Sequence, residues 1–389
     1  MPDPCLMIVA GERSGDVYGA GLATALRDRL GEVEIFGCGG DAMRRAGVET
    51  TVDAHAVAVA GIVEVVSALP RVYRAFHALL AEAGRRRPQL AVLIDFPDFN
   101  LRLAKRLKRR NIPVVYLVSP QIWAWRPGRI KQIKSNVTKM LCIFDFEEDL
   151  YRKVGVPVEY VGHPLVDAVK PHHSREEFFA KAGLDLATPT VALLPGSRRK
   201  EVAYNLPPML DAATRLTLAR KVQFVIPIAQ TLDPLWLEST LLECYVGRAT
   251  VRTVTNATYD VLHHSDVAVV ASGTATLEAA LCERPMVVVY RVSPLTWMIG
   301  KLLVKVPYYS MVNLLARKPL VTELMQREFS ARNVAAQVEC LLDHLEARNT
   351  MVEGLRALRS RLGPGGAIGR AADTVADVLK ASRATFATP

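Results

Sequence analysis

The chain alternates short apolar runs with longer amphipathic stretches. The apolar runs end at glycine, proline or polar residues, and patterns with helical spacing lie between them. This alternation predicts parallel strands whose sheet is covered by helices on both faces. In the first half of the chain, strands are expected at Leu6–Ala10, Glu34–Phe36, Leu90–Ile94, Val114–Val118, Lys139–Ile143 and Val158–Val161.

The same pattern starts again after a polar segment at Pro171–Pro189. Further strands are expected at Val191–Leu194, Val222–Ile226, Thr250–Val254, Val267–Val270 and Met286–Val289, and the sequence from Val334 onward has a helical pattern. A chain of 389 residues is too long for one ordinary core. The sequence therefore predicts an α/β protein with two doubly wound units joined by one linker.

Composition adds a charge argument. The chain has 49 Lys and Arg against 39 Asp and Glu, a net charge of +10, which favours anionic partners such as phosphates or acidic lipid. A basic solvated surface is the alternative. No RNA-binding signature or helix-turn-helix pattern is found, so no nucleic-acid partner is expected. The six cysteines form no CxxC motif and lie in apolar stretches, which predicts reduced core thiols. Neither a signal peptide nor a membrane-spanning helix is expected.

A small-residue loop follows the strand at Val191–Leu194. Gly196 lets the backbone approach a ligand, Ser197 can cap the helix expected from Arg199, and Arg198 can donate two hydrogen bonds to an anion. The free N–H groups of a helix N-terminus bind phosphate well. The alternative is a plain turn with a surface arginine.

A second loop of this kind follows the strand at Val267–Val270. It contains Ser272, Gly273 and Thr274, and Glu278 lies one helical turn further on, where its carboxylate can accept hydrogen bonds from two ribose hydroxyls. Alternatively, Glu278 compensates the helix dipole. The two loops together predict a nucleotide site.

The strand at Leu90–Ile94 ends in a polar loop that carries Asp95, Asp98 and Asn100. Asp98 is a candidate general base for a sugar hydroxyl, and Asp95 is its rival because it leads the same loop. An N-cap role is the alternative for Asp98. Trp123 and Arg126, which follow the next strand, suit a sugar face or an acyl surface, or else packing between domains.

Motif spacing excludes several classes of enzyme. The loop Gly11–Asp16 matches neither the dinucleotide-binding nor the P-loop spacing, which argues against a dehydrogenase or a P-loop kinase. The histidines form no HExxH motif, and no D-x-D pair occurs. We therefore expect neither a metal nor a cofactor.

One stretch suggests membrane contact. Apolar residues at Ile62–Leu80 have a broad helical spacing, arginines flank them, and Pro70 is expected to start a second helix. A basic amphipathic helix of this kind can lie in a membrane interface. The alternative is ordinary core packing. Trp297–Lys305 shows a similar pattern.

Several motifs resemble a known family when they are taken as a set. In chain order they are GERSGD, DFPDFN, SPQIWAWR, VGHPLVD, LLPGSRRKEV, ASGTATLEAAL and NLLARKPLVTELMQ. From about Gly11 to Gln326 the chain closely resembles the bacterial lipid-A-disaccharide synthases, which are GT-B glycosyltransferases. The resemblance implies two Rossmann-like domains facing a central cleft. They would be an acceptor-binding domain at 1–168 and a nucleotide-sugar-binding domain at 169–345, with a helical tail at 346–389 that packs back on the first domain.

The resemblance also implies a reaction. The family transfers diacylglucosamine from UDP to the 6-hydroxyl of a diacylglucosamine 1-phosphate, with inversion and release of UDP, in lipid A biosynthesis. It implies a UDP-sugar donor, an acylated sugar-phosphate acceptor, and an anionic inner-membrane surface that a cytoplasmic protein would meet peripherally on its cytoplasmic face. Whether the chain forms a homodimer stays open. Matching motif positions are Asp98 for catalysis, Arg198, Glu278, Asn313 and Gln326 for the donor, and Ser14 and Asp16 in the first loop.

Two other readings stay open at this point. Another GT-B enzyme, such as a UDP-N-acetylglucosamine 2-epimerase or an undecaprenyl-lipid glycosyltransferase, would share the nucleotide loops without needing DFPDFN. A non-enzymatic nucleotide- or nucleic-acid-binding module would account for the net charge alone.

Overall fold

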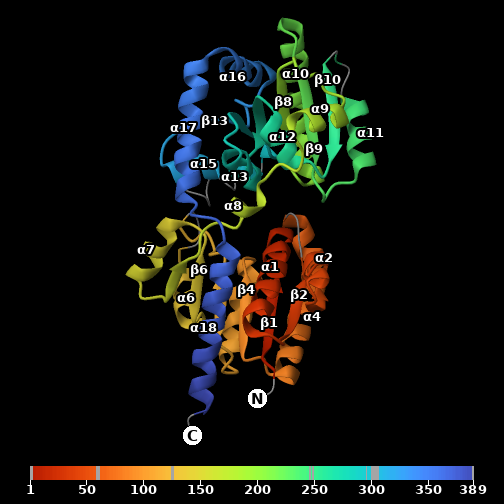
Figure 1. Ribbon diagram of the computed structural model, residues 1–389. Coiled ribbons are helices and arrows are strands. Elements are labelled where there is room, and N and C mark those ends of the chain that lie inside the picture. The colour runs from red at the N-terminus through yellow and green to blue at the C-terminus, as the bar shows by residue number, and fades with distance from the viewer. Residues whose placement is uncertain are drawn as a thin grey trace. The chain divides into compact units, whose positions relative to one another are not determined.

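The computed structural model describes residues 3–57, 62–123, 127–244, 247, 249–294, 296–298 and 306–387. The chain divides into two compact units, each built around a parallel sheet (Figure 1). Unit 1 comprises Met1–Pro164 and Leu362–Pro389, and unit 2 comprises Leu165–Arg361. The predicted α/β class is confirmed.

Unit 1 contains a seven-stranded sheet of order β3-β2-β1-β4-β5-β6-β7. Neighbouring strands pair in parallel, and β1 and β4 are buried along their whole length, because helices cover both faces of such a sheet. The strands are β1 (Cys5–Ala10), β2 (Glu34–Gly39), β3 (Glu49–Asp53), β4 (Leu90–Ile94), β5 (Val114–Leu117), β6 (Lys139–Cys142) and β7 (Val158–Tyr160).

The helices of unit 1 are α1 (Arg13–Leu30), α2 (Asp41–Arg45), α3 (Ala54–Val57), α4 (Ile62–Arg86), α5 (Pro97–Lys108), α6 (Arg129–Asn136), α7 (Asp145–Lys153) and α18 (Ala367–Ala387). The prediction that Pro70 starts a second helix is wrong, because Pro70 lies inside the single helix α4. Leu79 of α4 is fully buried, and Val72 and Phe76 pack against the core of unit 1. This packing outweighs the missing proline N–H.

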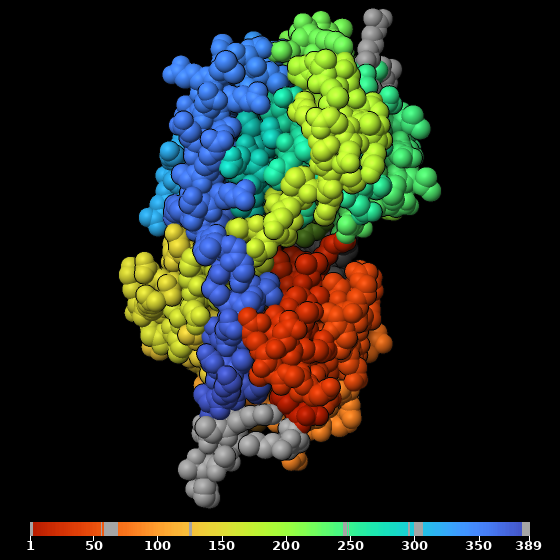
Figure 2. Space-filling model, in the orientation of Figure 1, coloured from red at the N-terminus to blue at the C-terminus, as the bar shows by residue number. Residues whose placement is uncertain are grey.

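The C-terminal helix α18 belongs to unit 1 although it is distant in sequence. It packs along α1, as the adjoining blue and red surfaces in Figure 2 show, and Arg29 pairs with Asp373. The Arg370 guanidinium donates to the carbonyl of Val161 at 2.6 and 2.9 Å. Because α17 (Leu345–Arg361) packs on unit 2, the unit boundaries lie at 164/165 and 361/362, not at the expected 168/169 and 345/346.

Unit 2 repeats the topology of unit 1 with a six-stranded parallel sheet of order β10-β9-β8-β11-β12-β13. Its strands are β8 (Thr190–Leu194), β9 (Gln223–Ile228), β10 (Thr250–Thr255), β11 (Val267–Ala271), β12 (Met286–Tyr290) and β13 (Thr322–Met325). Its other helices include α8 (Leu165–Ala168), α9 (Arg175–Ala182), α10 (Arg199–Ala219), α11 (Pro234–Cys244), α12 (Thr258–His264), α13 (Thr274–Leu281), α15 (Met311–Ala316) and α16 (Ala331–Asp343).

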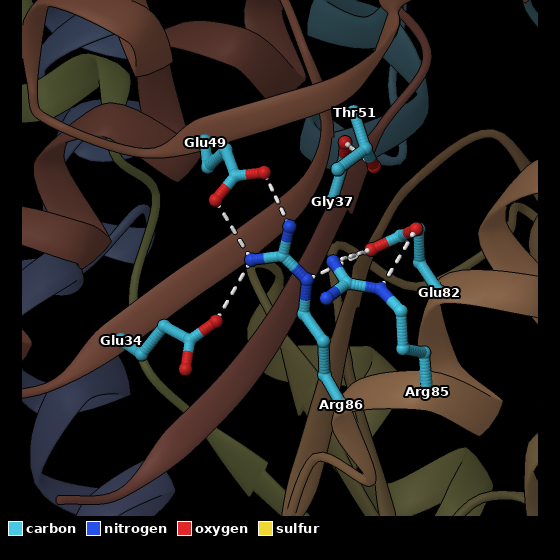
Figure 3. A network of polar contacts seen from close by, with 7 residues as sticks. All are labelled: Glu34, Gly37, Glu49, Thr51, Glu82, Arg85 and Arg86. Carbon is cyan, nitrogen blue, oxygen red and sulfur yellow. Dashed lines mark hydrogen bonds and ion pairs between the residues drawn. The ribbon is translucent and has the colours of Figure 1, made fainter.

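A charged network closes the amino-terminal edge of the unit 1 sheet (Figure 3). Arg86, at the end of α4, pairs with Glu34 at the start of β2, with Glu49 at the start of β3, and with Glu82 one turn back. Its side chain is 11% exposed and its guanidinium lies 4.8 Å from the centre of the Phe36 ring. The arginine therefore ties α4 to two strands.

Within the described residues, no helix has the length and apolar character needed to cross a membrane. Five cysteines have described side chains, and all five are free thiols. Cys340 differs from the expectation because it is half-buried, whereas Cys5, Cys38, Cys142 and Cys282 lie in the core. The side chain of Cys244 lies outside the described set.

Candidate active site

In each sheet, the order in which the chain adds strands reverses at one point. In unit 1 the order reverses between β1 and β4, and in unit 2 it reverses between β8 and β11. Ligands of open parallel sheets bind beside such switch points, at the carboxyl ends of the strands. The four loops that follow these strands carry most of the predicted site residues, so each unit brings its own set together at one edge.

The loops at this edge of unit 1 have unusual backbone. Asp95 and Phe96, directly after β4, have φ of 46° and 49°, and Val118, directly after β5, has φ of 66°. Left-handed conformations of non-glycine residues cost about 1–3 kcal/mol each and gather at functional sites. Gly11, after β1, lies so close to the Phe96 ring that a Cβ there would collide with it.

Asp95 is half-buried, and burial raises the pKa of its carboxyl to about 6, with a further contribution from the nearby Glu12 carboxylate. Its carbonyl accepts hydrogen bonds from the Tyr116 hydroxyl at 2.6 Å and from Asn100 Nδ2 at 2.8 Å. The loop is therefore held through its backbone, while the carboxyl stays available for proton transfer near neutral pH.

Asp98 lies in the first turn of α5, and Phe96, not Asp98, occupies the N-cap position. The N-cap alternative for Asp98 is therefore excluded. Its side chain is 62% exposed and pairs with Arg129, whose side chain is only 9% exposed. A nearly buried guanidinium fixes the carboxylate that it pairs with. Arg129 lies 31 positions further along the chain, and sequence analysis missed it because no motif marks it.

Two other predicted residues of this loop set are buried. The Asp16 carboxylate is buried and accepts hydrogen bonds from the backbone N–H groups of Gly40, Ala42 and Met43 at 2.6, 2.9 and 3.1 Å, so it secures the start of α2. Asn100 is fully buried, and its Oδ1 has no hydrogen-bond partner within the described residues. Ser14 is exposed in the first turn of α1.

Trp123 is half-buried, and its indole N–H donates to Glu147 Oε1 at 3.2 Å. Its ring meets Phe146 edge to face, with the ring centres 5.3 Å apart. Glu147 is a further residue that sequence analysis missed. Arg126 lies outside the described residues.

In unit 2 the first predicted loop leads into α10, which begins at Arg199 as expected. Gly196 has φ of 126°, which favours glycine. The N-cap is Arg198, so the expected capping role of Ser197 is wrong. Instead, Glu201 Oε2 accepts from the Ser197 N–H at 3.1 Å, and Glu201 Oε1 accepts from Arg198 Nη1 at 3.1 Å. The Arg198 side chain is 61% exposed.

The second predicted loop leads into α13, with Gly273 at its N-cap. Thr274 is exposed at the first position of this helix, and the Ser272 hydroxyl donates to the carbonyl of Tyr309 at 2.9 Å. Glu278 is half-buried and accepts from the Tyr259 hydroxyl at 3.3 Å. Burial raises the pKa of Glu278 above its ordinary value.

Asn313 is buried and its amide is fully engaged. It donates to the carbonyl of Val321 at 2.9 Å and to Glu323 Oε1 at 2.8 Å, and it accepts from the Val321 N–H at 2.9 Å. Glu323 also accepts from the backbone N–H groups of Tyr309 and Ser310, each at 2.9 Å. Asn313 therefore joins α15 to β13 and holds the segment that Ser272 contacts.

Gln326 directly follows β13 and has φ of 52°. Its amide satisfies both backbone groups of Val292, at 3.1 and 3.2 Å, when its nitrogen faces the carbonyl. Asn205, a buried residue of α10, connects the loop after β12 to the loop after β8. It accepts from the Arg291 N–H at 2.9 Å and donates to the carbonyl of Pro195 at 3.0 Å. Within unit 2, hydrogen bonds thus link the loops after β8, β12 and β13.

The two sets of residues suit different chemistry. Unit 2 offers an exposed arginine, a helix N-terminus and a half-buried carboxyl, which suit a nucleotide diphosphate and a ribose. Unit 1 offers two carboxyls that could take a proton from a hydroxyl. No group of three or more His, Cys, Asp or Glu side chains in the described ranges is arranged to hold a metal ion.

Solved structures with the same arrangement define the class. The calicheamicin glycosyltransferase superposes with a TM-score of 0.60 at 15% identity, covering 98% of this chain and 99% of that one. The UDP-GlcNAc 2-epimerase from Neisseria meningitidis, bound to UDP-GlcNAc, gives 0.62 at 12% identity, covering 96% and 99%. MurG of Acinetobacter baumannii gives 0.57 at 12%, covering 97% and 100%. The fold is that of the GT-B glycosyltransferases and epimerases, as expected.

Sequence similarity identifies the family within that class. Residues 6–363 match the lipid-A-disaccharide synthetase family. The lipid-A-disaccharide synthase of Koribacter versatilis is 48% identical over 92% of this chain and 94% of its own length, and that of Myxococcus xanthus is 45% identical over 98% and 99%. The chain belongs to the lipid-A-disaccharide synthase family. The resemblance is thus confirmed, and a glycosyltransferase of lipid A biosynthesis is favoured over the epimerase and the non-enzymatic module.

Proposed function

We propose that the chain joins UDP-2,3-diacylglucosamine to 2,3-diacylglucosamine 1-phosphate, giving the lipid A disaccharide 1-phosphate and UDP with inversion at the anomeric carbon. The observation that carries this proposal is the family match over residues 6–363. The physical setting supports it, because a chain with a net charge of +10 suits an anionic nucleotide and an anionic acceptor.

In the proposed reaction, unit 2 holds the donor. The N-terminus of α10 and the Arg198 guanidinium would neutralise the diphosphate as it departs, which is the electrostatic help that a leaving anion needs. Gly196, Ser197, Ser272, Gly273 and Thr274 would present backbone and hydroxyl groups, and Glu278 would accept from the ribose. Asn313 and Gln326 would act by holding this region in shape, since their amides are engaged within the protein.

Asp98 is the proposed general base. It would take the proton of the acceptor 6-hydroxyl while the hydroxyl oxygen forms a bond to the anomeric carbon and the bond from that carbon to UDP breaks. The geometry supports this role, because the carboxylate is exposed enough to meet a substrate and Arg129 orients it. Asp95, Ser14, Trp123 and Arg126 would serve the acceptor side.

We further propose that the chain associates reversibly with the cytoplasmic face of the inner membrane. Leu69 and Tyr73 of α4 are 54% and 66% exposed, next to the basic residues Arg71 and Arg74. The other half of the predicted stripe is core, because Phe76 and Leu79 pack inward, and the Val66 side chain lies outside the described set. Met298, 58% exposed, offers a second apolar position, and residues 299–305 of that second stretch lie outside the described ranges.

Liposome binding separates the exposed half of the stripe from the buried half. Leu69→Ser with Tyr73→Ser should weaken binding to anionic liposomes and leave the melting temperature nearly unchanged. Leu79→Ser, the matched control, should unfold unit 1 instead. Full liposome binding by the first variant would show that α4 does not contact the membrane.

Whether the chain forms a homodimer is tested by light scattering, which compares the mass in solution with the chain mass of 42.8 kDa.

The decisive experiment measures UDP release when the purified chain meets UDP-diacylglucosamine, with and without diacylglucosamine 1-phosphate. A synthase requires the acceptor, whereas an epimerase consumes its donor alone. The same assay in EDTA tests the expected independence from metal. Loss of activity that magnesium restores would contradict that expectation, and UDP release without acceptor would contradict the proposed transfer.

A further inference from the structure

The donor loop, residues 195–198 after β8, is covered by the carboxylate of Glu201. Its Oε2 accepts from the Ser197 N–H at 3.1 Å, and its Oε1 accepts from Arg198 Nη1 at 3.1 Å. A backbone N–H at the start of a helix and a guanidinium are donors with which proteins commonly bind phosphate oxygens. One internal carboxylate therefore takes up two hydrogen-bond donors that suit a diphosphate.

The Glu201 side chain lies against the backbone of this loop. A Cβ at Gly196 would lie 2.8 Å from Glu201 Oε2 and 2.7 Å from Glu201 Cβ, so glycine is needed to leave room for the acid. The Glu201 side chain is 20% exposed, whereas that of Arg198 is 61% exposed. The acid is thus packed on the loop, while the arginine stays open to a ligand that arrives from solvent.

Other contacts hold the donor loop in shape. Asn205 Nδ2 donates to the carbonyl of Pro195 at 3.0 Å, and the hydroxyl of Thr231, which lies after β9, donates to the carbonyl of Ser197 at 2.6 Å. Both partners are neutral, and both bind carbonyl groups of the loop. Glu201, in contrast, binds N–H donors, which are the groups that an anion would use. Its charge is therefore not needed to fix the two carbonyls.

The charge of Glu201 opposes an anion at the donor loop. A carboxylate close to a diphosphate repels it, and at a protein surface this repulsion is only partly screened. A diphosphate would also compete for the Ser197 N–H and the Arg198 guanidinium, which Glu201 engages. Both effects have the same sign, because each lowers the affinity of the loop for a nucleoside diphosphate.

We propose that Glu201 is an internal ligand of the donor loop, which the diphosphate of the donor displaces. The place of the diphosphate rests on the proposed function, whereas the contacts of Glu201 do not. On binding, phosphate oxygens take over the two donors and the Glu201 side chain turns toward solvent. After transfer of the sugar, Glu201 competes with UDP for the same donors and thereby favours release of the product.

Calorimetric titration with UDP tests the displacement without any assay of activity. Glu201→Gln removes the charge, and glutamine serves at this position of a helix N-terminus much as glutamate does. The variant should bind UDP about three- to tenfold more tightly than the wild type. Uridine, which lacks the diphosphate, should bind both proteins with the same affinity. Asp211→Asn, which removes an exposed carboxylate from the same helix, is the matched control and should bind UDP as the wild type does.

A second measurement uses the wild type, so that the test does not depend on how the variant folds. The backbone amide of Ser197 and the side-chain carboxyl of Glu201 should both change chemical shift when UDP saturates the protein, because each exchanges its partner. Signals that stay in place would show that the carboxylate keeps its donors while UDP is bound, and they would overturn the proposal.

The binding data separate the role of Glu201 from the proposed function. UDP binding that is unchanged or weaker in Glu201→Gln overturns the proposal, and weaker binding would mean that Glu201 positions Arg198 for the phosphate. An equal gain for uridine, or in Asp211→Asn, overturns it too, because the effect would not concern the diphosphate at this loop. If neither the wild type nor the variant binds UDP, the donor site of the proposed function fails as well. If both bind UDP equally, only the role of Glu201 falls.

Discussion

The two edges of the unit 1 sheet treat charge in opposite ways. At the amino edge, Arg86 pairs with three carboxylates and lies against an aromatic ring, so the charges of this network are paired (Figure 3). At the carboxyl edge, Asp95 and Glu147 are carboxyls whose pKa values burial raises, and Asn100 keeps a buried oxygen without a described partner.

Positive φ occurs at both edges, but in different settings. At the amino edge, Arg87 and Asn111 follow the ends of α4 and α5, where a left-handed residue is an ordinary helix end. At the carboxyl edge, Asp95, Phe96 and Val118 directly follow strands. Strain and unpaired polar atoms lower stability, so a fold tolerates them where they prepare a site for a ligand. The comparison teaches that contacts at the amino edge stabilise unit 1, whereas the carboxyl edge carries the candidate site at a cost in stability. Each variant below tests one of these two statements.

Asp98→Asn should have the largest effect, a loss of about a hundredfold or more in kcat. The amide cannot take a proton. Asp98 is exposed and is not the N-cap, but its carboxylate neutralises the nearly buried Arg129, so the free energy of unfolding should fall by about 1 kcal/mol, a small change beside the loss of kcat. Steady-state kinetics and urea denaturation check both parts. Turnover near that of the wild type would move the base to Asp95.

Arg198→Ala should lower kcat/KM for the donor by about ten- to a hundredfold, because a charge-assisted contact to a phosphate is typically worth ~1.5–3 kcal/mol. The side chain is 61% exposed, so stability should be kept. Arg199→Ala, at the next exposed position, is the matched control. Donor kinetics that stay unchanged in Arg198→Ala would place Arg198 outside the site.

Arg86→Met tests the other edge. It should lower the free energy of unfolding by roughly 1–3 kcal/mol, because it leaves three neighbouring carboxylates without their common cation. Since Glu34 and Glu49 are more than half exposed, water limits the loss. Activity per folded molecule should stay that of the wild type. Denaturation with parallel kinetics checks this, and a fall in kcat without a loss of stability would break the comparison.

The sequence predicted the buried strands well, and the two strands that it missed both lie at sheet edges. The strand at Leu90–Ile94 has its predicted bounds, because a strand buried on both faces is a continuous apolar run. No strand was predicted at Glu49–Asp53 or Thr322–Met325, which lie at sheet edges and are largely polar, half-buried segments. The helix break expected at Pro70 failed because packing of the following turns outweighs local preference.

The site residues also divide into those that the local sequence predicts and those that depend on contacts distant in sequence. Position after a strand was enough to place Asp98 and Arg198 at the carboxyl edges of their sheets. Arg129 and Glu147 could not be found that way, because their roles depend on contacts with residues 31 and 24 positions away. Glu201 left a signal, since an acidic residue three positions after an N-cap is typical of helix capping.

The smallest expected effect concerns Glu12→Gln. Burial first, and the Glu12 carboxylate second, raise the pKa of Asp95 to about 6 from its ordinary value of 3.8. Folded protein therefore holds this proton more tightly than unfolded chain does, so the contribution of Asp95 to stability falls as pH rises from about 4 to 6 and is constant above. Removing the Glu12 charge should lower the pKa of Asp95 by a fraction of a unit, since burial remains. The carbon-13 chemical shift of the Asp95 carboxyl, followed from pH 3 to 8, measures it, and Asp95→Asn assigns the signal. Asp3→Asn, which removes a carboxylate not among the causes of this shift, is the control. An unchanged midpoint in Glu12→Gln would mean that burial alone prepares this carboxyl at the carboxyl edge.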